Sequence, residues 1–159
     1  MPNWCQNILE ITGNTADLES FTGVAEDNKF SLETYYPYET EDGDWDYTWC
    51  INNWGTKWDV SEQGGMFLIA EGEEVPVNSI TLVINNNRIS ISFLTAWGPP
   101  ESAIMHISGN HPKLEFKLIY AEAGNNFAGT TSVSAGNLIM QEEGKFEDYI
   151  KIYDFNNAY

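Results

Sequence analysis

Two tryptophans flank a cation in the segment from Asn53 to Asp59, which has the sequence Asn-Trp-Gly-Thr-Lys-Trp-Asp. An ammonium group between two indole rings suits cation–π contact, and rings beside a lysine also suit a stacked base and its phosphate. The candidate ligand-pocket residues are Trp54, Lys57, Trp58, Asp59 and Trp97, the last of which ends an expected strand. The structural alternative is that both rings of the segment fill the core and that Lys57 pairs with Asp59.

Residues 39–46 carry the densest negative charge of the chain, with five carboxylates among eight residues. Aromatic residues surround this run, from Tyr35 to Trp49. Rings left in water lose free energy, so a segment needed only for solubility has no reason to carry them. The expected partner-binding residues are Glu39, Glu41, Asp42, Asp44, Asp46, Tyr38, Trp45 and Tyr47. The alternative is a solvated loop whose rings pack on the body of the protein.

The alternating aspartates of this run do not make a calcium-binding loop. Asp42, Asp44 and Asp46 have the spacing of the first ligands of an EF-hand. Such a loop requires Gly at its sixth position and Glu at its twelfth, and these positions hold Tyr47 and Asn53. We therefore predict no metal at this segment, with a nonspecifically bound divalent ion as the alternative.

No other spacing in the chain predicts catalysis or a cofactor. His106 and His111 lack further zinc ligands, because neither Cys5 nor Cys50 belongs to a C-x-x-C pair. The chain also lacks a G-x-S-x-G nucleophile motif and a complete phosphate-binding loop. We expect no catalytic residues, no metal, no cofactor and a protein that is not an enzyme. The two cysteines are expected as free buried thiols.

Charge sets further limits on the function. The 159-residue chain has a formal net charge of −17, and 16 of its 24 acidic residues precede Pro76. Direct binding to nucleic acid needs cations that displace counterions from phosphates, and Arg88 is the one arginine. No apolar run approaches the roughly 20 residues of a membrane-spanning helix, and the first residues do not form a signal peptide. We expect a soluble cytoplasmic protein that contacts neither nucleic acid nor membrane directly.

Hydrophobic periodicity and turn residues predict strands and helices in a recognisable order. Strands are expected at residues 3–12, 79–84, 88–94 and 114–121, with a turn at Asn85–Asn87. Helices are expected at residues 15–24, capped by Thr15, and at 99–109, where Ala103, Ile104 and Ile107 form the apolar face. The order strand, helix, strand, strand, helix, strand is that of a ferredoxin-like split βαβ, an α+β fold with a mostly antiparallel sheet and two helices.

Two parts of the chain lie outside this frame. Residues 26–44 are expected to be irregular, and they are followed by an aromatic strand at 46–52, a short apolar run at 66–70 and a turn at 71–76. Further strands are expected at 126–134, 137–141 and 145–155, with a tight turn at 142–144. We predict a single domain over residues 1–159, with an acidic aromatic insertion at about 26–50 and a C-terminal β extension from about 124.

Four segments together resemble one family. They are residues 1–7 (Met-Pro-Asn-Trp-Cys-Gln-Asn), 53–59, 95–100 and 122–129. They are similar to segments of the YubB-type ferredoxin-like proteins found on phages, plasmids and bacterial mobile elements. The resemblance implies a ferredoxin-like domain in the cytoplasm of a bacterial host, and it implies no particular activity. The matching residues Asn3, Trp4, Asn7, Trp54, Lys57, Trp58, Asp59 and Trp97 are candidates for a shared site or a shared core.

Two functions fit these observations. The first is a phage- or mobile-element-encoded DNA mimic, which inhibits a host defence nuclease or nucleoprotein by presenting carboxylates where the target binds phosphates. Tyr38, Trp45 and Tyr47 would anchor that interface. This hypothesis requires the acidic side chains before Pro76 to converge on one surface. The second is a small-ligand or nucleotide-binding module built on the Trp/Lys pocket.

Overall fold

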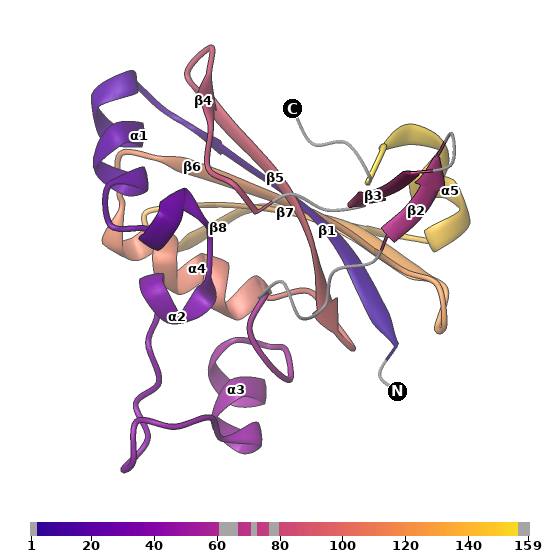
Figure 1. Cartoon of the computed structure of the whole chain (residues 1–159), viewed down its shortest axis with the longest axis horizontal. Helices are drawn as coiled ribbons and strands as arrows, with labels where there is room; N and C mark the ends of the chain where they lie inside the picture. Colours follow the sequence, from indigo (N-terminus) through magenta and orange to yellow (C-terminus); the bar gives the residue numbers. More distant parts are fainter. Residues whose placement is uncertain (1–2, 61–66, 71–72, 77–79, 156–159) are drawn as a thin grey trace.

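The computed structural model describes residues 3–60, 67–70, 73–76 and 80–155, and its main feature is a six-stranded antiparallel sheet (Figure 1). The strands of this sheet are β1 (Trp4–Thr12), β4 (Ile84–Asn85), β5 (Arg88–Ala96), β6 (Glu115–Glu122), β7 (Phe127–Ser134) and β8 (Asn137–Gly144). β2 (Phe67–Ala70) and β3 (Glu73–Pro76) form a separate antiparallel pair. The helices are α1 (Thr15–Thr22), α2 (Leu32–Tyr35), α3 (Tyr47–Asn53), α4 (Glu101–Asn110) and α5 (Phe146–Ile152), with a short 3-10 helix η1 (Glu26–Asn28).

The strand order β4-β5-β1-β6-β7-β8 contains the ferredoxin-like arrangement. β1 pairs antiparallel with β5 and β6, so that Leu9 lies opposite Ile91 on one side and Leu118 on the other. The unit β5-α4-β6 therefore encloses β1, as a split βαβ requires. The predicted fold class is confirmed, with β7 and β8 extending the sheet beyond β6.

The elements around the largest core cluster follow the sequence pattern closely. The predicted apolar face of α4 is confirmed, because Ala103, Ile104 and Ile107 are all buried. Asn14, one residue before the predicted Thr15, caps α1 by accepting a hydrogen bond from the Asp17 backbone N–H. Because Asn and Thr are both good N-cap residues, the sequence leaves the helix start uncertain by one position.

The hairpin predicted before α4 is confirmed at its turn and its second strand, but the strand expected at 79–84 is wrong. β4 consists of Ile84 and Asn85 alone, because residues 80–82 pair instead with residues 28–30 of the insertion, and residue 79 lies outside the described residues. The turn of the hairpin lies at Asn86 and Asn87, whose φ angles are 52° and 60°. Asparagine enters this left-handed region more readily than other non-glycine residues, so the asparagine run marks the turn.

The C-terminal segment differs from the prediction. Residues 145–155 were expected to be a strand, but Phe146–Ile152 form helix α5, and the expected turn at 142–144 is the end of β8. Phe146, Tyr149 and Tyr153 are spaced three and four residues apart, and they pack on a small apolar cluster around Ile119. Because Ile119 and Leu118 are neighbours on one strand, α5 lies on the face of the sheet opposite to α4.

The acidic insertion is more ordered than predicted. Residues 26–44 include η1 and α2, and Phe30, Leu32 and Tyr35 are buried in the main core. The strand expected at 46–52 is the helix α3, whose first N–H groups are capped by Asp46. The turn expected at 71–76 contains the strand β3, while residues 71–72 lie outside the described residues. Burial of Phe30, Leu32 and Tyr35 explains why the insertion packs on the main core.

The two cysteines are free and buried. Burial raises the pKa of the Cys50 thiol to about 11 and raises that of Cys5 further above its ordinary value, with nearby Glu122 adding to the shift at Cys5. Both thiols are therefore protonated near neutral pH, where a nucleophile would need the thiolate. Within the described residues, no helix has both the length and the apolar composition needed to cross a bilayer.

A buried amide joins β1 to β5. Asn7 Nδ2 lies 2.8 Å from Thr95 Oγ1 and 3.0 Å from the Cys5 carbonyl, and the Thr95 hydroxyl donates to the Gly98 carbonyl at 2.6 Å. We expect Asn7→Ala to lower the free energy of unfolding by about 1–3 kcal/mol, because it removes a buried donor and leaves its acceptors unpaired. Urea denaturation measures the change.

The control for this prediction is a double-mutant cycle with Thr95→Val, which keeps the shape of the side chain. The two residues should be coupled by about 0.5–3 kcal/mol. Strictly additive effects of the two substitutions would contradict the buried bond as the cause.

Candidate partner-binding surface

Two of the residues predicted to line a ligand pocket, Trp54 and Asp59, have structural roles instead. Trp54 is fully buried, and its Nε1 donates to the Tyr36 carbonyl at 3.0 Å. The Asp59 carboxylate accepts from the backbone N–H groups of Leu32 at 2.7 Å and Glu33 at 3.0 Å. It thereby satisfies the first N–H groups of α2. Burial raises the pKa of this carboxyl, and the backbone hydrogen bonds oppose that shift.

Two further rings, Tyr38 and Trp49, pack with Trp54 and anchor the segment that carries the acidic residues. The Tyr38 ring lies 4.8 Å from the Trp54 ring and 5.6 Å from the Trp49 ring, and Trp49 is 5.4 Å from Trp54. Burial raises the pKa of the Tyr38 hydroxyl. Tyr38, expected as a partner-binding residue, is therefore half-buried and holds the segment on the core.

The acidic lobe, which we define as residues 39–46, lies between this anchor and α3. Glu39, Glu41, Asp42 and Asp44 are exposed. The lobe turns back on itself through a hydrogen bond from Thr40 Oγ1 to the Asp44 carbonyl at 2.9 Å. These four carboxylates project into solvent from an ordered turn.

Asp46 differs from the other acids of the lobe. Although it is exposed, its Oδ1 accepts from the Trp49 backbone N–H at 2.7 Å and caps α3. The expected partner-binding role therefore overlaps with a structural one at this residue.

The lobe adjoins the tryptophans that the sequence placed in a separate candidate site. Trp45 Nε1 donates to the Lys57 carbonyl at 2.9 Å, and the Tyr47 ring meets the Trp97 ring edge-on at 5.8 Å. Lys57 Nζ lies 4.8 Å from the ring centre of Trp58 and 4.9 Å from that of Trp97. The structure thus brings both predicted sets together on one surface, which we call the lobe–ring surface.

Three large rings of this surface remain open to solvent. Trp45 is 49% exposed, Tyr47 is 43% exposed and Trp97 is 42% exposed. Lys57 does not pair with Asp59 as the structural alternative proposed, because the Asp59 oxygens accept backbone hydrogen bonds and the Lys57 ammonium lies against rings.

Trp97 has a strained backbone. Its φ angle is 74°, in the left-handed region, where a bulky side chain is a genuine outlier. Its N–H donates to the Asn3 carbonyl at 2.8 Å, which fixes the start of β1 against this corner. Strain of this kind costs on the order of 1–3 kcal/mol and is often found where a side chain serves a function. Here the strained residue presents an exposed indole.

The acidic residues before Pro76 do not all join the lobe–ring surface. Glu10 lies on β1, 3.8 Å from Arg88, and the partly buried Asp59 accepts hydrogen bonds from the first N–H groups of α2. α1, which carries Asp17 and Glu19, lies at the opposite end of the molecule from the lobe (Figure 1). Convergence on one surface therefore holds for the lobe and not for the whole first half of the chain.

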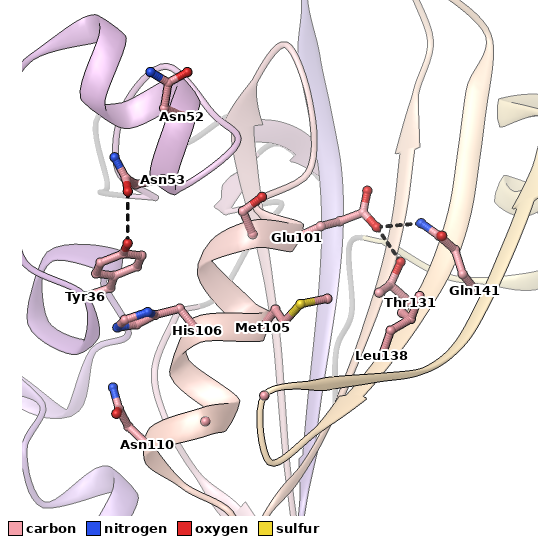
Figure 2. A pocket seen from close by; sticks show the side chains of 13 residues that line it. Tyr36, Asn52, Asn53, Glu101, Met105, His106, Asn110, Thr131, Leu138 and Gln141 are labelled. Carbon is pink, nitrogen blue, oxygen red and sulfur yellow. Dashed lines mark hydrogen bonds between the residues drawn. The ribbon is translucent and has the colours of Figure 1, made fainter.

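A second surface feature was missed by the sequence analysis. A groove of about 690 Å³ lies over the exposed side of α4, between Tyr36 and α3 on one side and β7 and β8 on the other (Figure 2). Glu101 accepts hydrogen bonds from Thr131 and Gln141, at 2.6 and 3.1 Å. The residues that line the groove come from segments far apart in the sequence, so no local pattern could have predicted the groove.

The histidines do not form a metal site. His106 lies in this groove and stacks on Tyr36 with ring centres 3.7 Å apart, whereas the His111 ring meets the Phe21 ring edge-on at 4.9 Å. Among the residues that the structure describes, no group of three or more His, Cys, Asp or Glu side chains could hold a metal ion.

Burial lowers the pKa of His111 below its ordinary value of 6.5. As the pH falls below this value, the unfolded chain gains a proton that the folded protein resists, so the histidine's contribution to stability is lost. We expect the stability of the protein to decrease relative to that of His111→Phe between about pH 7 and pH 5. Urea unfolding of both proteins across this range measures the difference, and parallel pH curves would contradict the prediction.

The geometry defines a ferredoxin-like α+β protein with an added acidic lobe, and comparison with known proteins agrees on the ferredoxin-like fold. The family model described as "Ferredoxin-like domain in Api92-like protein" matches residues 79–158, and the chain belongs to this family. No curated protein sequence matches the chain.

A solved structure shares the fold. It is the crystal structure of protein api92 from Yersinia pseudotuberculosis, which is 10% identical in sequence. The TM-score is 0.58, and the match covers 91% of this chain and 98% of that chain. At this identity the likeness concerns the fold alone.

Proposed function

We propose that this is a binding protein that docks its lobe–ring surface on a basic, nucleic-acid-binding surface of another protein. The observation that carries the proposal is the exposure of Trp45, Tyr47 and Trp97 beside four projecting carboxylates. Clustered exposed apolar groups mark interaction sites, and aromatic residues are frequent anchors of protein interfaces. The rings supply the centre of such an interface, and the carboxylates supply its charge.

Charge complementarity selects the partner. The chain carries a net charge of −17, and the Lys57 ammonium beside the lobe is held against the rings of Trp58 and Trp97. Proteins that bind nucleic acid present surfaces rich in lysine and arginine, and carboxylates can occupy the places of phosphates there. The resemblance to proteins of phages and plasmids supports a host defence nuclease or nucleoprotein as the target, with this protein as its inhibitor in the bacterial cytoplasm.

A capture experiment with two charge variants tests the proposal. The lobe variant replaces four carboxylates with lysine, at Glu39, Glu41, Asp42 and Asp44. The control variant makes the same net change of charge at exposed acids elsewhere, at Glu19, Glu26, Glu33 and Glu147. Asp46 stays unchanged because it caps α3. Immobilised wild-type and variant proteins are exposed to a bacterial lysate, and bound proteins are then challenged with duplex DNA.

The proposal requires a protein that the wild type and the control variant capture, that the lobe variant loses, and that duplex DNA releases. Loss of capture by both variants would show that only overall charge matters, and equal capture by all three proteins would show that neither the lobe nor the overall charge matters. Either result would contradict the proposal. Capture that duplex DNA cannot reverse would remove the mimicry and the nucleic-acid-binding partner from the proposal.

A nucleotide is the second candidate ligand, favoured by the position of Lys57 between two rings. Only Lys57, Trp58 and Trp97 remain for it, because Trp54 is fully buried and Asp59 caps α2. A bound base would also have to displace the ammonium from the ring faces. Calorimetry against a panel of nucleotides decides the matter. Heat that is lost in Lys57→Ala would support this candidate, and its absence across the panel would remove it.

A further inference from the structure

The two edges of the main sheet are treated differently by the fold. At one edge, β4 has only two residues, and the segment just before β4 forms a β-bridge with the acidic insertion, between Thr81 and Lys29. The Phe30 N–H donates to the Ile80 carbonyl at 2.8 Å, and the Leu82 N–H donates to the Asn28 carbonyl at 2.7 Å. The insertion therefore protects that edge, as natural proteins commonly do.

The other edge is open. β8 pairs only with β7 in the described part of the chain, and all eight of its residues are exposed. Its centre carries three large apolar side chains in succession, with Leu138 at 49%, Ile139 at 66% and Met140 at 38% exposure. A β-bulge lies among them, because Ser132 pairs with Met140 and Val133 with Leu138, which leaves Ile139 as the extra residue. A long edge strand with apolar side chains is a template for pairing with another strand. We propose that β8 receives an extended segment of a partner protein as a seventh strand.

Charge fixes the chemistry of that segment. Glu142 and Glu143 follow the apolar residues on β8, and both are exposed. A partner segment that pairs antiparallel with β8 runs in the opposite direction. Its residues opposite the two glutamates therefore come before its residues opposite Leu138 to Met140. An antiparallel complementary segment therefore has two basic residues first and apolar residues after them. Cross-strand pairs of opposite charge stabilise a sheet, as do pairs of apolar side chains.

A second copy of this chain does not meet that requirement. Antiparallel pairing of two β8 strands about Ile139 would place Gly136 opposite Glu142 and Ala135 opposite Glu143. Neither residue supplies a cation. Two copies that each carry a net charge of −17 also repel each other. The open edge is thus better matched to a foreign basic segment than to itself.

Strand addition is a known mode of peptide recognition, in which main-chain hydrogen bonds give affinity and alternate side chains give specificity. It would give this protein a binding surface that uses none of the residues of the lobe–ring surface. The inference therefore stands whether or not the acidic lobe binds a nucleic-acid-binding protein.

The test uses the full-length protein and a synthetic peptide, Lys-Lys-Thr-Val-Thr-Val, carrying a fluorophore. Binding is measured by fluorescence anisotropy, and its location by hydrogen exchange of the β8 amides. We expect the peptide to slow exchange of amides in Asn137–Gly144. Peptide attracted only to the acidic lobe would leave β8 exchange unchanged, and that result would overturn the proposal.

A charge-swap pair provides the matched control. We expect the double variant Glu142→Lys and Glu143→Lys to bind the peptide about 2- to 30-fold more weakly, and to bind Glu-Glu-Thr-Val-Thr-Val more tightly than the wild type does. Equal affinity of the variant and the wild type for both peptides would contradict the assigned orientation and charge. Sedimentation of the free protein supplies the last outcome, since dimers that Ile139→Lys dissociates would assign the edge to a second copy and overturn the proposal.

Discussion

Reversing the four projecting carboxylates of the acidic lobe is expected to slow association with a basic partner about 10- to 1,000-fold at low ionic strength. The substituted residues are Glu39, Glu41, Asp42 and Asp44, all exposed. They attract a basic surface before contact forms, so their main effect falls on the association rate and less on the dissociation rate. Stopped-flow mixing with the captured partner measures both rates.

Salt dependence makes this prediction sharper. Wild-type association should slow steeply as ionic strength rises, because the charges act through solvent over about 10 Å at 0.1 M salt. The rates of the lobe variant should respond weakly to salt. The control variant with lysines at Glu19, Glu26, Glu33 and Glu147 has the same net charge as the lobe variant but keeps the carboxylates of the lobe, so it should retain most of the wild-type rate. A control variant as slow as the lobe variant would mean that the total charge, and not the lobe, steers the encounter.

The second large effect is expected in stability. Trp54→Ala should lower the free energy of unfolding by about 3–5 kcal/mol, because it removes the largest fully buried side chain and opens a cavity. Small domains have a total stability of about 5–15 kcal/mol, so the loss is a large part of the whole. Urea denaturation at constant pH measures the change.

Trp54 also supports the acidic lobe, so the Trp54→Ala substitution should destabilise the lobe as well. Tyr38 and Trp49 both pack on the Trp54 ring, and hydrogen exchange in residues 36–53 should become faster in the variant. Trp45→Ala is the matched control, since Trp45 is half exposed and its removal should change stability by about 0.5 kcal/mol or less. When the two variants are compared at the same folded fraction, Trp45→Ala should weaken partner binding more than Trp54→Ala does, because Trp45 would contact the partner directly. A Trp54→Ala protein with the same free energy of unfolding as the wild type would contradict a stabilising role of the buried Trp54 side chain.

The central fold could be predicted because its signals are local. The asparagine run marks the turn between β4 and β5, and the prolines with Ala103, Ile104 and Ile107 mark α4. The segments predicted wrongly are those in which residue type and spacing disagree. Aromatic residues favour strands, and this preference outweighed the helical spacing of Phe146, Tyr149 and Tyr153 in α5. In α3, the same aromatic composition obscured the capping role of Asp46.

The candidate surface could be predicted only in its parts. The sequence indicated an acidic aromatic run and a Trp/Lys segment, but not that they adjoin. Their contacts join Trp45 to Lys57, which follows it by 12 residues, and Tyr47 to Trp97, which lies much further along the chain. The two tryptophans also differ in burial, since Trp54 lies in the core and Trp97 is exposed at the surface. Neither outcome has a local signal, because both depend on how the insertion folds back on the sheet.

The acidic lobe begins after the half-buried Tyr38 and ends at the helix cap Asp46, so both of its ends are fixed by contacts with the scaffold. The residues between these points carry charge but contribute little to the core. This part of the chain can therefore change its sequence without endangering the domain, as grafted recognition loops do on other rigid scaffolds. Selection for a new target would act there first, while the residues that hold the two attachment points stay constant.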